Sequence, residues 1–302
     1  MIYTVTFNPS LDYKTECDDF SIGKTNRSIR ESVTLGGKGV NVSKALTSLG
    51  ADNASVLFVG SGEIGSIIEK RMSEELAFPI AVKTRGDNRI NTKVICSGTV
   101  TEINARGSLD ISEESLIEAL ELMKIKGGDI VVVSGNTVKS GVLTDFCKKL
   151  LETCQDVKLI LDVAESEMKD IIELYGDNII LIKPNRDEFC KVFGSFDGLD
   201  AKLRNINTQA VAVTDGSGAV YYRGDSGDVY RVFPPKVTAV DTVGAGDSFI
   251  AGYLYAICNG IEGVEAVKVA VAVSSCKVSR YGFSSLRNSL ESCYIVKTER
   301  AD

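Results

Sequence analysis

The first stretch that suggests chemistry is 239–257, AVDTVGAGDSFIAGYLYAI, where a loop of small residues runs into an apolar helical pattern. Gly244 and Gly246 stand at the junction, and Asp247 follows them. Glycine lets the backbone approach a ligand closely, and a helix N-terminus attracts an anion. An acid beside such amides can accept a proton from an alcohol while the amides stabilise a transferring phosphoryl group. One interpretation is therefore phosphoryl transfer with Asp247 as the general base.

The alternative is that Asp247 only caps the helix, since Asp is favoured at helix N-termini, and this stretch alone does not choose between the two. Two nucleotide-binding signatures are absent: there is no GxxxxGK[ST], and GxGxxG fails because residue 249 is Phe. The chain also contains no histidine. Any general base must therefore be Asp, Glu, Lys, Cys or Tyr.

A second glycine-rich turn precedes a helical pattern at 35–46, LGGKGVNVSKAL. Its glycines, Gly37 and Gly39 among them, are expected to admit a polyol against the backbone, with Asn41 hydrogen-bonding the hydroxyl groups. Lys38 is expected to meet a phosphate. A tight turn with a solvated lysine is the alternative interpretation of this motif.

Two further motifs follow predicted strands. In IKPNRDEF, 182–189, Asn185 and Glu188 are spaced i, i+3 and share one helical face. Their oxygens suit water-mediated Mg²⁺ binding, and an Asn cap with Glu at the third helical position is the alternative. The stretch VTDGSGAV, 213–220, ends a strand in a glycine-containing turn, which shapes a nucleotide pocket or is a plain hairpin turn.

Short runs rich in β-branched residues must position these motifs. Each run is nearly all apolar and ends in Gly, Asp, Pro or Ser, which is typical of strands buried on both faces of a parallel sheet. Helical patterns lie between the runs, and this alternation predicts a wound α/β core. The runs are 2–7, 54–60, 129–135, 157–162, 178–184 and 209–216, and the helical patterns include 39–49, 64–76, 113–124 and 143–154.

Two more polar stretches, 12–34 and 87–104, interrupt this rhythm. Neither suits a buried parallel strand, so we expect a small antiparallel sheet that projects as a lid or dimer flap, with a solvated edge extension as the alternative. Arg89 is the best candidate for a bidentate phosphate contact, although any one of the cations here also fits a solvated surface charge. The charged residues of interest are Asp12, Lys24, Arg27, Arg89 and Lys93.

Composition narrows the class of protein. The formal net charge of -7 disfavours binding to nucleic acid or to an anionic membrane. The eight cysteines form no CxxC pair, and the short start MIYTVTF lacks a basic leader. These features predict a cytoplasmic protein whose cysteines are mostly small core residues. A zinc site is disfavoured because the ligand spacing and histidine are both missing.

The order of the motifs resembles one family. NPSLD after the first strand, GGKGVNVSKAL, KPNRDE and DTVGAGDSFIAGY follow one another as in the ribokinase-like carbohydrate kinases of the PfkB type, across essentially the whole chain. The resemblance implies a three-layer α/β/α core with a mostly parallel central sheet and a small antiparallel β lid. It also implies one kinase domain over 1–302, with the lid segments 12–34 and 87–104 inserted in it, and a homodimer formed through the lid.

Within the family, NPSLD with GGKGVN is similar to the sugar-phosphate kinases. NRINTKV followed by TEIN looks most like the kinases that use ATP and Mg²⁺ to phosphorylate fructose 1-phosphate at its 6-hydroxyl, giving fructose 1,6-bisphosphate and ADP. Kinases of tagatose 6-phosphate and of fructose 6-phosphate are near neighbours. A catalytically silent sugar-phosphate sensor is the rival from another class, and the failed GxGxxG spacing disfavours a dinucleotide oxidoreductase.

The resemblance implies a role for the residues of each motif. Asp247 resembles the catalytic base, beside an anion hole formed by Gly244, Ala245 and Gly246. Asn185 and Glu188 resemble the pair that organises Mg²⁺, Glu188 through water. The implied sugar-phosphate contacts are Asp12, Gly37, Lys38, Gly39, Asn41, Arg89 and Asp247, and the implied ATP contacts are Asn185, Thr214, Asp215, Gly216, Gly218 and Gly246.

The chain departs from the family pattern in two loops. SGNTVKSG, 134–141, lacks the usual proline and is one residue longer than expected beside the sugar phosphate. TDGSG, 214–218, is one residue shorter than the usual nucleotide loop. The choice of sugar and of nucleotide is therefore less constrained than the reaction class.

Overall fold

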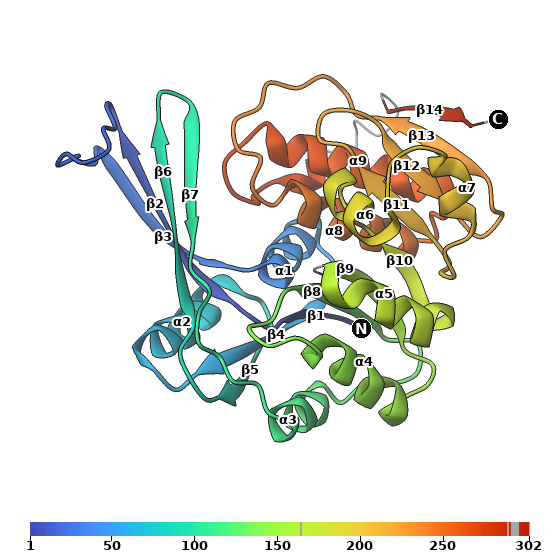
Figure 1. Ribbon diagram of the computed structural model, residues 1–302, viewed down its shortest axis with the longest axis horizontal. Helices are drawn as coiled ribbons and strands as arrows, with labels where there is room; N and C mark the ends of the chain where they lie inside the picture. The colour runs from blue at the N-terminus through green and yellow to red at the C-terminus, as the bar shows by residue number, and fades with distance from the viewer. Residues whose placement is uncertain (164, 289, 291–295, 302) are drawn as a thin grey trace.

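The computed structural model describes residues 1–163, 165–288, 290 and 296–301, whose strands form two sheets (Figure 1). The larger sheet has ten strands. From edge to edge they are β14 (Lys297–Arg300), β13 (Val229–Phe233), β12 (Val220–Arg223), β11 (Val211–Thr214), β10 (Ile179–Ile182), β9 (Lys158–Val163), β8 (Ile130–Gly135), β1 (Ile2–Thr6), β4 (Asn53–Gly60) and β5 (Pro79–Thr84). The strands from β11 to β5 run parallel, and β12 to β14 add an antiparallel edge.

Both faces of the parallel strands are buried. Val56 and Phe58 of β4 join the core on one side of the sheet, while Leu57 and Val59 join the core on the other. Because neither face meets water, the expected runs could be almost entirely apolar, and each of them coincides with one parallel strand. The predicted wound α/β core with a mostly parallel sheet is confirmed.

Helices cover both faces of this sheet and complete three layers (Figure 1). One face carries α3 (Glu113–Met123), α4 (Val142–Thr153), α5 (Glu165–Tyr175), α6 (Arg186–Phe193) and α7 (Leu199–Arg204), and a short 3₁₀ helix, η1 (Gly176–Asn178), leads into β10. The other face carries α1 (Lys38–Leu49), α2 (Glu63–Glu75), α8 (Ala245–Cys258) and α9 (Gly263–Val278). The helical patterns expected at 39–49, 64–76, 113–124 and 143–154 match α1 to α4 within one residue.

The second sheet is the expected lid, and it stands away from the three layers (Figure 1). Its strands are β3 (Arg30–Gly36), β2 (Ser10–Cys17), β6 (Arg89–Cys96) and β7 (Thr99–Asn104), in that order. The outer pairs are antiparallel as predicted, whereas the central pair, β2 with β6, is parallel. The reason is that two separate hairpins leave the body after β1 and after β5 and run side by side.

The cysteines are less buried than the sequence suggested. Only Cys17 and Cys147 are buried among the seven that the structure describes, Cys258 is exposed, and the other four are half-buried. Cys293 lies outside the described residues. The expectation that most are core residues is therefore wrong, because several sit on partly exposed element ends. In the same described part of the chain, no helix is long and apolar enough to cross a membrane.

Candidate active site

The loop before α8 forms the centre of the site. Gly244 is the residue at which the helix starts, and its φ of 76° lies in the left-handed region that favours glycine. A Cβ at Gly244 would come within 2.6 Å of the Phe283 ring. Asp247 lies in the first turn of α8, so Gly244 and not Asp247 is the capping residue of this helix. The carboxylate of Asp247 accepts a hydrogen bond from Asn41, and its role as a base stays a prediction.

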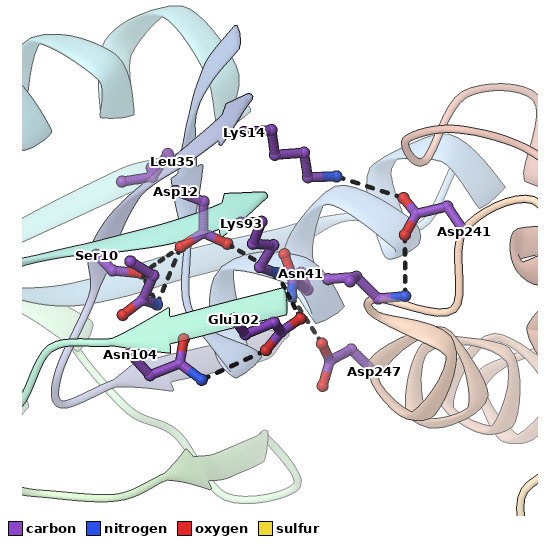
Figure 2. A network of polar contacts seen from close by, with 12 residues as sticks. Ser10, Asp12, Lys14, Leu35, Asn41, Lys93, Glu102, Asn104, Asp241 and Asp247 are labelled. Carbon is purple, nitrogen blue, oxygen red and sulfur yellow. Dashed lines mark hydrogen bonds and ion pairs between the residues drawn. The ribbon is translucent and has the colours of Figure 1, made fainter. Parts of the chain in front are cut away.

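The carboxylate of Asp247 is buried and held from α1. It is 7% exposed, and Asn41 Nδ2 donates a hydrogen bond of 2.8 Å to its Oδ2 (Figure 2). Burial raises the pKa of Asp247 to about 6, and the negative charge of Asp162 adds to this effect. A carboxylate with such a pKa is still ionised at neutral pH and is a stronger base than an ordinary aspartate.

A group of opposite charges lies beside Asp247, where β9 and β10 end. Lys183, which follows β10 and is 4% exposed, places its Nζ 3.4 Å from Oδ1 of Asp162. Lys38, the first residue of α1, places its Nζ 3.1 Å from the same oxygen. Burial favours a higher pKa for Asp162, but Lys183 and Lys38 outweigh it and hold the pKa below the usual value. Lys183 also lies close to the start of α8, since a Cβ on Gly246 would be 3.1 Å from its Nζ.

Asn185 and Glu188 form the capping box that was the alternative interpretation. Asn185 Oδ1 accepts the N–H of Glu188 at 2.9 Å, and Glu188 Oε2 accepts the N–H of Asn185 at 2.8 Å. Glu188 Oε1 lies 3.7 Å from the ammonium of Lys38. That oxygen suits the water shell of Mg²⁺, while no three acidic or thiol side chains in the described residues converge as metal ligands. Mg²⁺ at this place therefore stays a prediction, with Glu188 as the residue that would hold it through water.

The expected nucleotide loop is a hairpin turn between β11 and β12. The N–H of Gly218 donates to the carbonyl of Asp215 at 2.7 Å, and the Asp215 carboxylate pairs with Arg186 at 3.0 Å. Thr214 forms an isolated bridge with Asn185, so the turn lies next to the start of α6. Gly216 takes a φ of 53° within this turn. The structure thus brings the turn beside Asn185 and leaves its role toward a nucleotide as a prediction.

The lid presents charged residues toward Asp241 and Asp247, in the loop and first turn at the start of α8 (Figure 2). Lys93 is 5% exposed, and its Nζ lies 3.5 Å from Asp12 and 3.6 Å from Glu102. Asp12 Oδ1 also accepts hydrogen bonds from Ser10 Oγ at 2.7 Å and Asn91 Nδ2 at 3.1 Å. Asp12 is thus fixed from both hairpins of the lid, on the face that turns toward Asp247.

Arg89 lies at the base of the lid and does not extend freely. Its Nε donates to the carbonyl of Asn8 and its Nη1 to that of Ala105, each at 3.2 Å. Burial lowers its pKa, although the nearby Asp12 carboxylate opposes this. Lys24 and Arg27, the other cations singled out in the lid, are exposed in the loop between β2 and β3.

Gly37 and Gly39, at the start of α1, pack closely against the first strand. A Cβ on Gly37 would lie 2.6 Å from Cγ2 of Thr6, and one on Gly39 would lie 2.5 Å from Oγ1 of the same residue. Ser134 Oγ would be 3.0 Å from the Cβ on Gly39. These glycines therefore let α1 approach β1, and their contact with a polyol stays a prediction.

A cavity of about 710 Å³ opens between the lid, α1 and the loop before α8. Asp12, Lys14, Asn41 and Asp241 are among its lining residues. Several buried polar atoms in the described residues have no hydrogen-bond partner, among them Asn91 Oδ1 on the lid, but none of these atoms belongs to a residue that lines this cavity.

Sequence reasoning did not single out Asp162 or Lys183. Asp162 closes the apolar run VKLILD and Lys183 closes IILIK, so each is a charged residue at the carboxyl end of a buried strand. That position at the ligand-binding edge of a wound sheet was the available signal.

The fold and site are typical of a phosphotransferase that uses an alcohol as acceptor. The glycine-containing start of α8, a buried carboxylate with a raised pKa and two lysines meet at the carboxyl edge of a three-layer α/β/α sheet. The chain belongs to the pfkB family of carbohydrate kinases, whose family model matches residues 5–289. It is therefore a sugar kinase with ATP as the phosphoryl donor that this family implies.

Curated relatives support this family. The 1-phosphofructokinases of Borreliella burgdorferi and Bacillus subtilis are 33% and 34% identical to the chain, and each alignment covers 91% of both proteins. Tagatose-6-phosphate kinase of Staphylococcus epidermidis is 28% identical over 90% of both chains. Phosphofructokinase-2 from Escherichia coli has the same fold, with a TM-score of 0.85 at 23% identity over 97% of this chain and 98% of that chain.

Proposed function

We propose that this kinase transfers the γ-phosphoryl group of ATP to the 6-hydroxyl of fructose 1-phosphate, with Asp247 as the general base. The proposal rests on one observation: Asp247, in the first turn of α8, has a buried carboxylate that accepts a hydrogen bond from Asn41 of α1. The similarity to 1-phosphofructokinases and the NRINTKV and TEIN motifs support this sugar phosphate.

In this mechanism the acceptor hydroxyl lies against Asp247 and loses its proton to it as the oxygen attacks phosphorus. Asn41 keeps the carboxylate in one orientation by its 2.8 Å hydrogen bond. The raised pKa of Asp247 brings its proton affinity closer to that of the reacting alcohol in the transition state, which favours the transfer.

Fixed positive charge then stabilises the transferring group. The amides of Gly244, Ala245 and Gly246 point from the helix start, where the partial charge of the backbone is positive. The ammonium groups of Lys38 and Lys183 are held nearby by Asp162. Because these groups are already oriented in the free protein, little reorganisation accompanies the reaction.

Mg²⁺ fits the remaining donors. When bound with ATP it neutralises charge on the phosphate oxygens. Glu188 would hold it through water by the oxygen that faces Lys38, with Asn185 fixing the Glu188 side chain through the capping box. Thr214, Asp215, Gly216 and Gly218 form the adjacent turn, which we assign to the nucleotide side of the site.

The lid closes the sugar side. Asp12 faces the cavity and is the proposed hydroxyl ligand, and Arg89 is the proposed phosphate ligand once its bonds to the carbonyls of Asn8 and Ala105 rearrange. Closure excludes water, which would otherwise accept the phosphoryl group. Asn41 lines the opposite side of this cavity from α1. Gly37, Lys38 and Gly39 are the further sugar-phosphate contacts that we propose at the start of that helix.

We also assign the far face of the lid to a homodimer interface. Strand alternation and register put Val33, Ile90 and Ile103 on the face opposite Asp12, where they are 37%, 42% and 63% exposed. Exposed apolar side chains gathered on one sheet face are typical of a surface that binds a partner.

The test is an acceptor panel with the purified protein, ATP and Mg²⁺. We expect kcat/KM in a coupled spectrophotometric assay to be highest for fructose 1-phosphate. Tagatose 6-phosphate is the second candidate, because the Staphylococcus epidermidis relative bears that name, and a higher kcat/KM for it would replace the proposed acceptor. Sugar-phosphate binding without ADP formation would instead indicate a sensor.

A further inference from the structure

Asp241, in the loop before α8, is held from three directions. Its Oδ1 accepts the N–H of Val243 at 3.1 Å, within the same loop. Its Oδ2 accepts a 3.2 Å hydrogen bond from Lys277 and lies 3.4 Å from the ammonium of Lys14, a lid residue (Figure 2). The carboxylate therefore joins the lid, the loop and α9, and nothing in the proposed chemistry uses it.

Lys277 is the buried member of this group. It lies on α9 and is 1% exposed, and besides the carboxylate its ammonium also donates to the backbone carbonyl of Asp241 at 3.2 Å. The ammonium lies 5.5 Å from the centre of the Phe283 ring, and that ring packs against Gly244. A charged group with this degree of burial is costly unless it is paired, and Asp241 in the loop before α8 supplies that partner.

Helix α9 fixes the same loop at further points. The N–H groups of Val240 and Asp241 donate to the carbonyl of Val278 at 2.8 and 3.1 Å. Ser274 Oγ donates to the carbonyl of Ala245 at 2.9 Å. The loop that carries the amides of the anion site is therefore shaped by α9, and Lys277 provides the only charge-assisted contact among these.

We propose that Lys277 is a positioning residue for the phosphoryl transfer, acting as a built-in cation that holds the 241–244 loop in its anion-binding geometry. The inference rests on the proposed kinase function. A cation is required because the backbone carbonyl oxygen and the Oδ2 of Asp241 both accept hydrogen bonds from the buried Lys277 ammonium. An apolar side chain in its place would leave both oxygens without this donor. Lys14 contacts the same carboxylate from the lid, so the position of the lid and the geometry of the loop are linked.

The first experiment compares Lys277→Met with wild type. We expect kcat to fall by about 10- to 100-fold, because displacement of the anion-site amides by a fraction of an ångström weakens transition-state binding. KM for the sugar phosphate is expected to change much less, since Lys277 is 1% exposed and its ammonium is bound to Asp241. Lys268→Met is the matched control on the same helix, because Lys268 forms only a surface pair with Glu265 and its loss should leave kcat unchanged.

The second experiment separates positioning from simple stability. Lys277→Ala is assayed with ammonium or methylammonium chloride, and with sodium chloride to match ionic strength. A small cation that refills the site should restore part of kcat in this variant and leave wild type unaffected. Amide hydrogen exchange of the peptide covering 241–247 should rise in Lys277→Ala and fall again with ammonium.

The outcomes are distinct. Unchanged kcat in Lys277→Met, or unchanged exchange at 241–247 in Lys277→Ala, overturns the role of Lys277. If wild type forms no ADP with any sugar phosphate, the proposed function fails, while loosened exchange in Lys277→Ala would still support the positioning of the loop. If Lys277→Met does not fold, Lys14→Met is used instead, because it removes the partly exposed lid contact with Asp241. Amide hydrogen exchange at 241–247 is then compared with wild type. Unchanged exchange in Lys14→Met would count against a link between the lid and this loop.

Discussion

Asn41 and Asp247, which are 206 residues apart in the chain, meet through a 2.8 Å hydrogen bond between the first turns of α1 and α8. The two helices pack on the same face of the sheet, so the two glycine-rich motifs of the sequence converge on one carboxylate. Asn41 donates to Oδ2 of Asp247 and so restrains the rotation of the carboxylate. The bond thus fixes the direction in which Asp247 can accept a proton.

Asp247→Asn is expected to lower kcat by about 10²- to 10⁴-fold, because the amide cannot accept the proton while its shape is retained. The coupled assay with fructose 1-phosphate measures this, and circular dichroism verifies that the variant is folded. Near-wild-type turnover in a folded variant would rule out Asp247 as the base.

The pH profile should report the same group. Because the pKa of Asp247 is raised to about 6, kcat/KM is expected to decline as the pH falls below about 6, where the base becomes protonated. An acid limb near pH 4, which is typical of an unperturbed carboxylate, would contradict the raised pKa. Coupling enzymes active across this range, or direct detection of ADP, are required for the measurement.

Asp247→Asn should also change stability in a pH-dependent way. A folded pKa of about 6, above the ordinary 3.8, means that protonated Asp247 favours the folded state below about pH 4 and that this contribution is lost as the pH rises through 6. At pH 8 the variant is therefore expected to be more stable than wild type by about 1–3 kcal/mol, and at pH 4 the two should be similar. Denaturant titrations at both pH values test this, and a variant that is less stable at pH 8 would reverse the sign.

Lys93→Met is expected to raise KM for the sugar phosphate by about tenfold or more and to affect kcat less, by leaving Asp12 and Glu102 as unpaired negative charges on the lid face. Lys24→Met, at the exposed lid tip, is the matched control and should behave as wild type. An unchanged KM in Lys93→Met would place the sugar phosphate away from this face of the lid.

Ile103→Glu tests the dimer. A charge in the middle of a buried apolar interface is costly, so sedimentation equilibrium should show a dimer for wild type and a monomer for the variant. Ile67→Glu is the control, because Ile67 is a 45% exposed isoleucine on α2, away from the lid, and this variant should stay dimeric. A monomeric wild type would reject the interface.

The sequence was sufficient for the body of the fold because burial on both faces leaves a simple mark: runs such as ASVLFVG are apolar throughout. It also singled out Asp247, whose burial and bond to Asn41 the structure adds, while its role as the base stays a prediction. It did not reveal the parallel pairing of β2 with β6, because alternation within a strand says nothing about the direction of its neighbour.

Buried charges were the other limit. Lys277 resembles an ordinary surface lysine in the sequence, and Lys183 is marked only by its position after a buried strand, whereas their partners, Asp241 and Asp162, distinguish both in the structure. Those partners come from distant strands and loops, so no local spacing predicts the pairs. The pair Asn185 and Glu188 was predictable, since the i, i+3 spacing allowed the capping box that the structure contains. Its proposed role in holding Mg²⁺ stays a prediction.

The parallel junction between β2 and β6 has a consequence for protein engineering. The lid is not one module but two insertions that complete each other through a shared row of backbone hydrogen bonds. A chimera that takes 10–36 from one parent and 89–104 from another would have to match that row register for register, or expose two open strand edges to other chains. The two segments should therefore be exchanged together between relatives. For the same reason, substitutions in β2 and β6 are expected to depend on each other as sequences diverge.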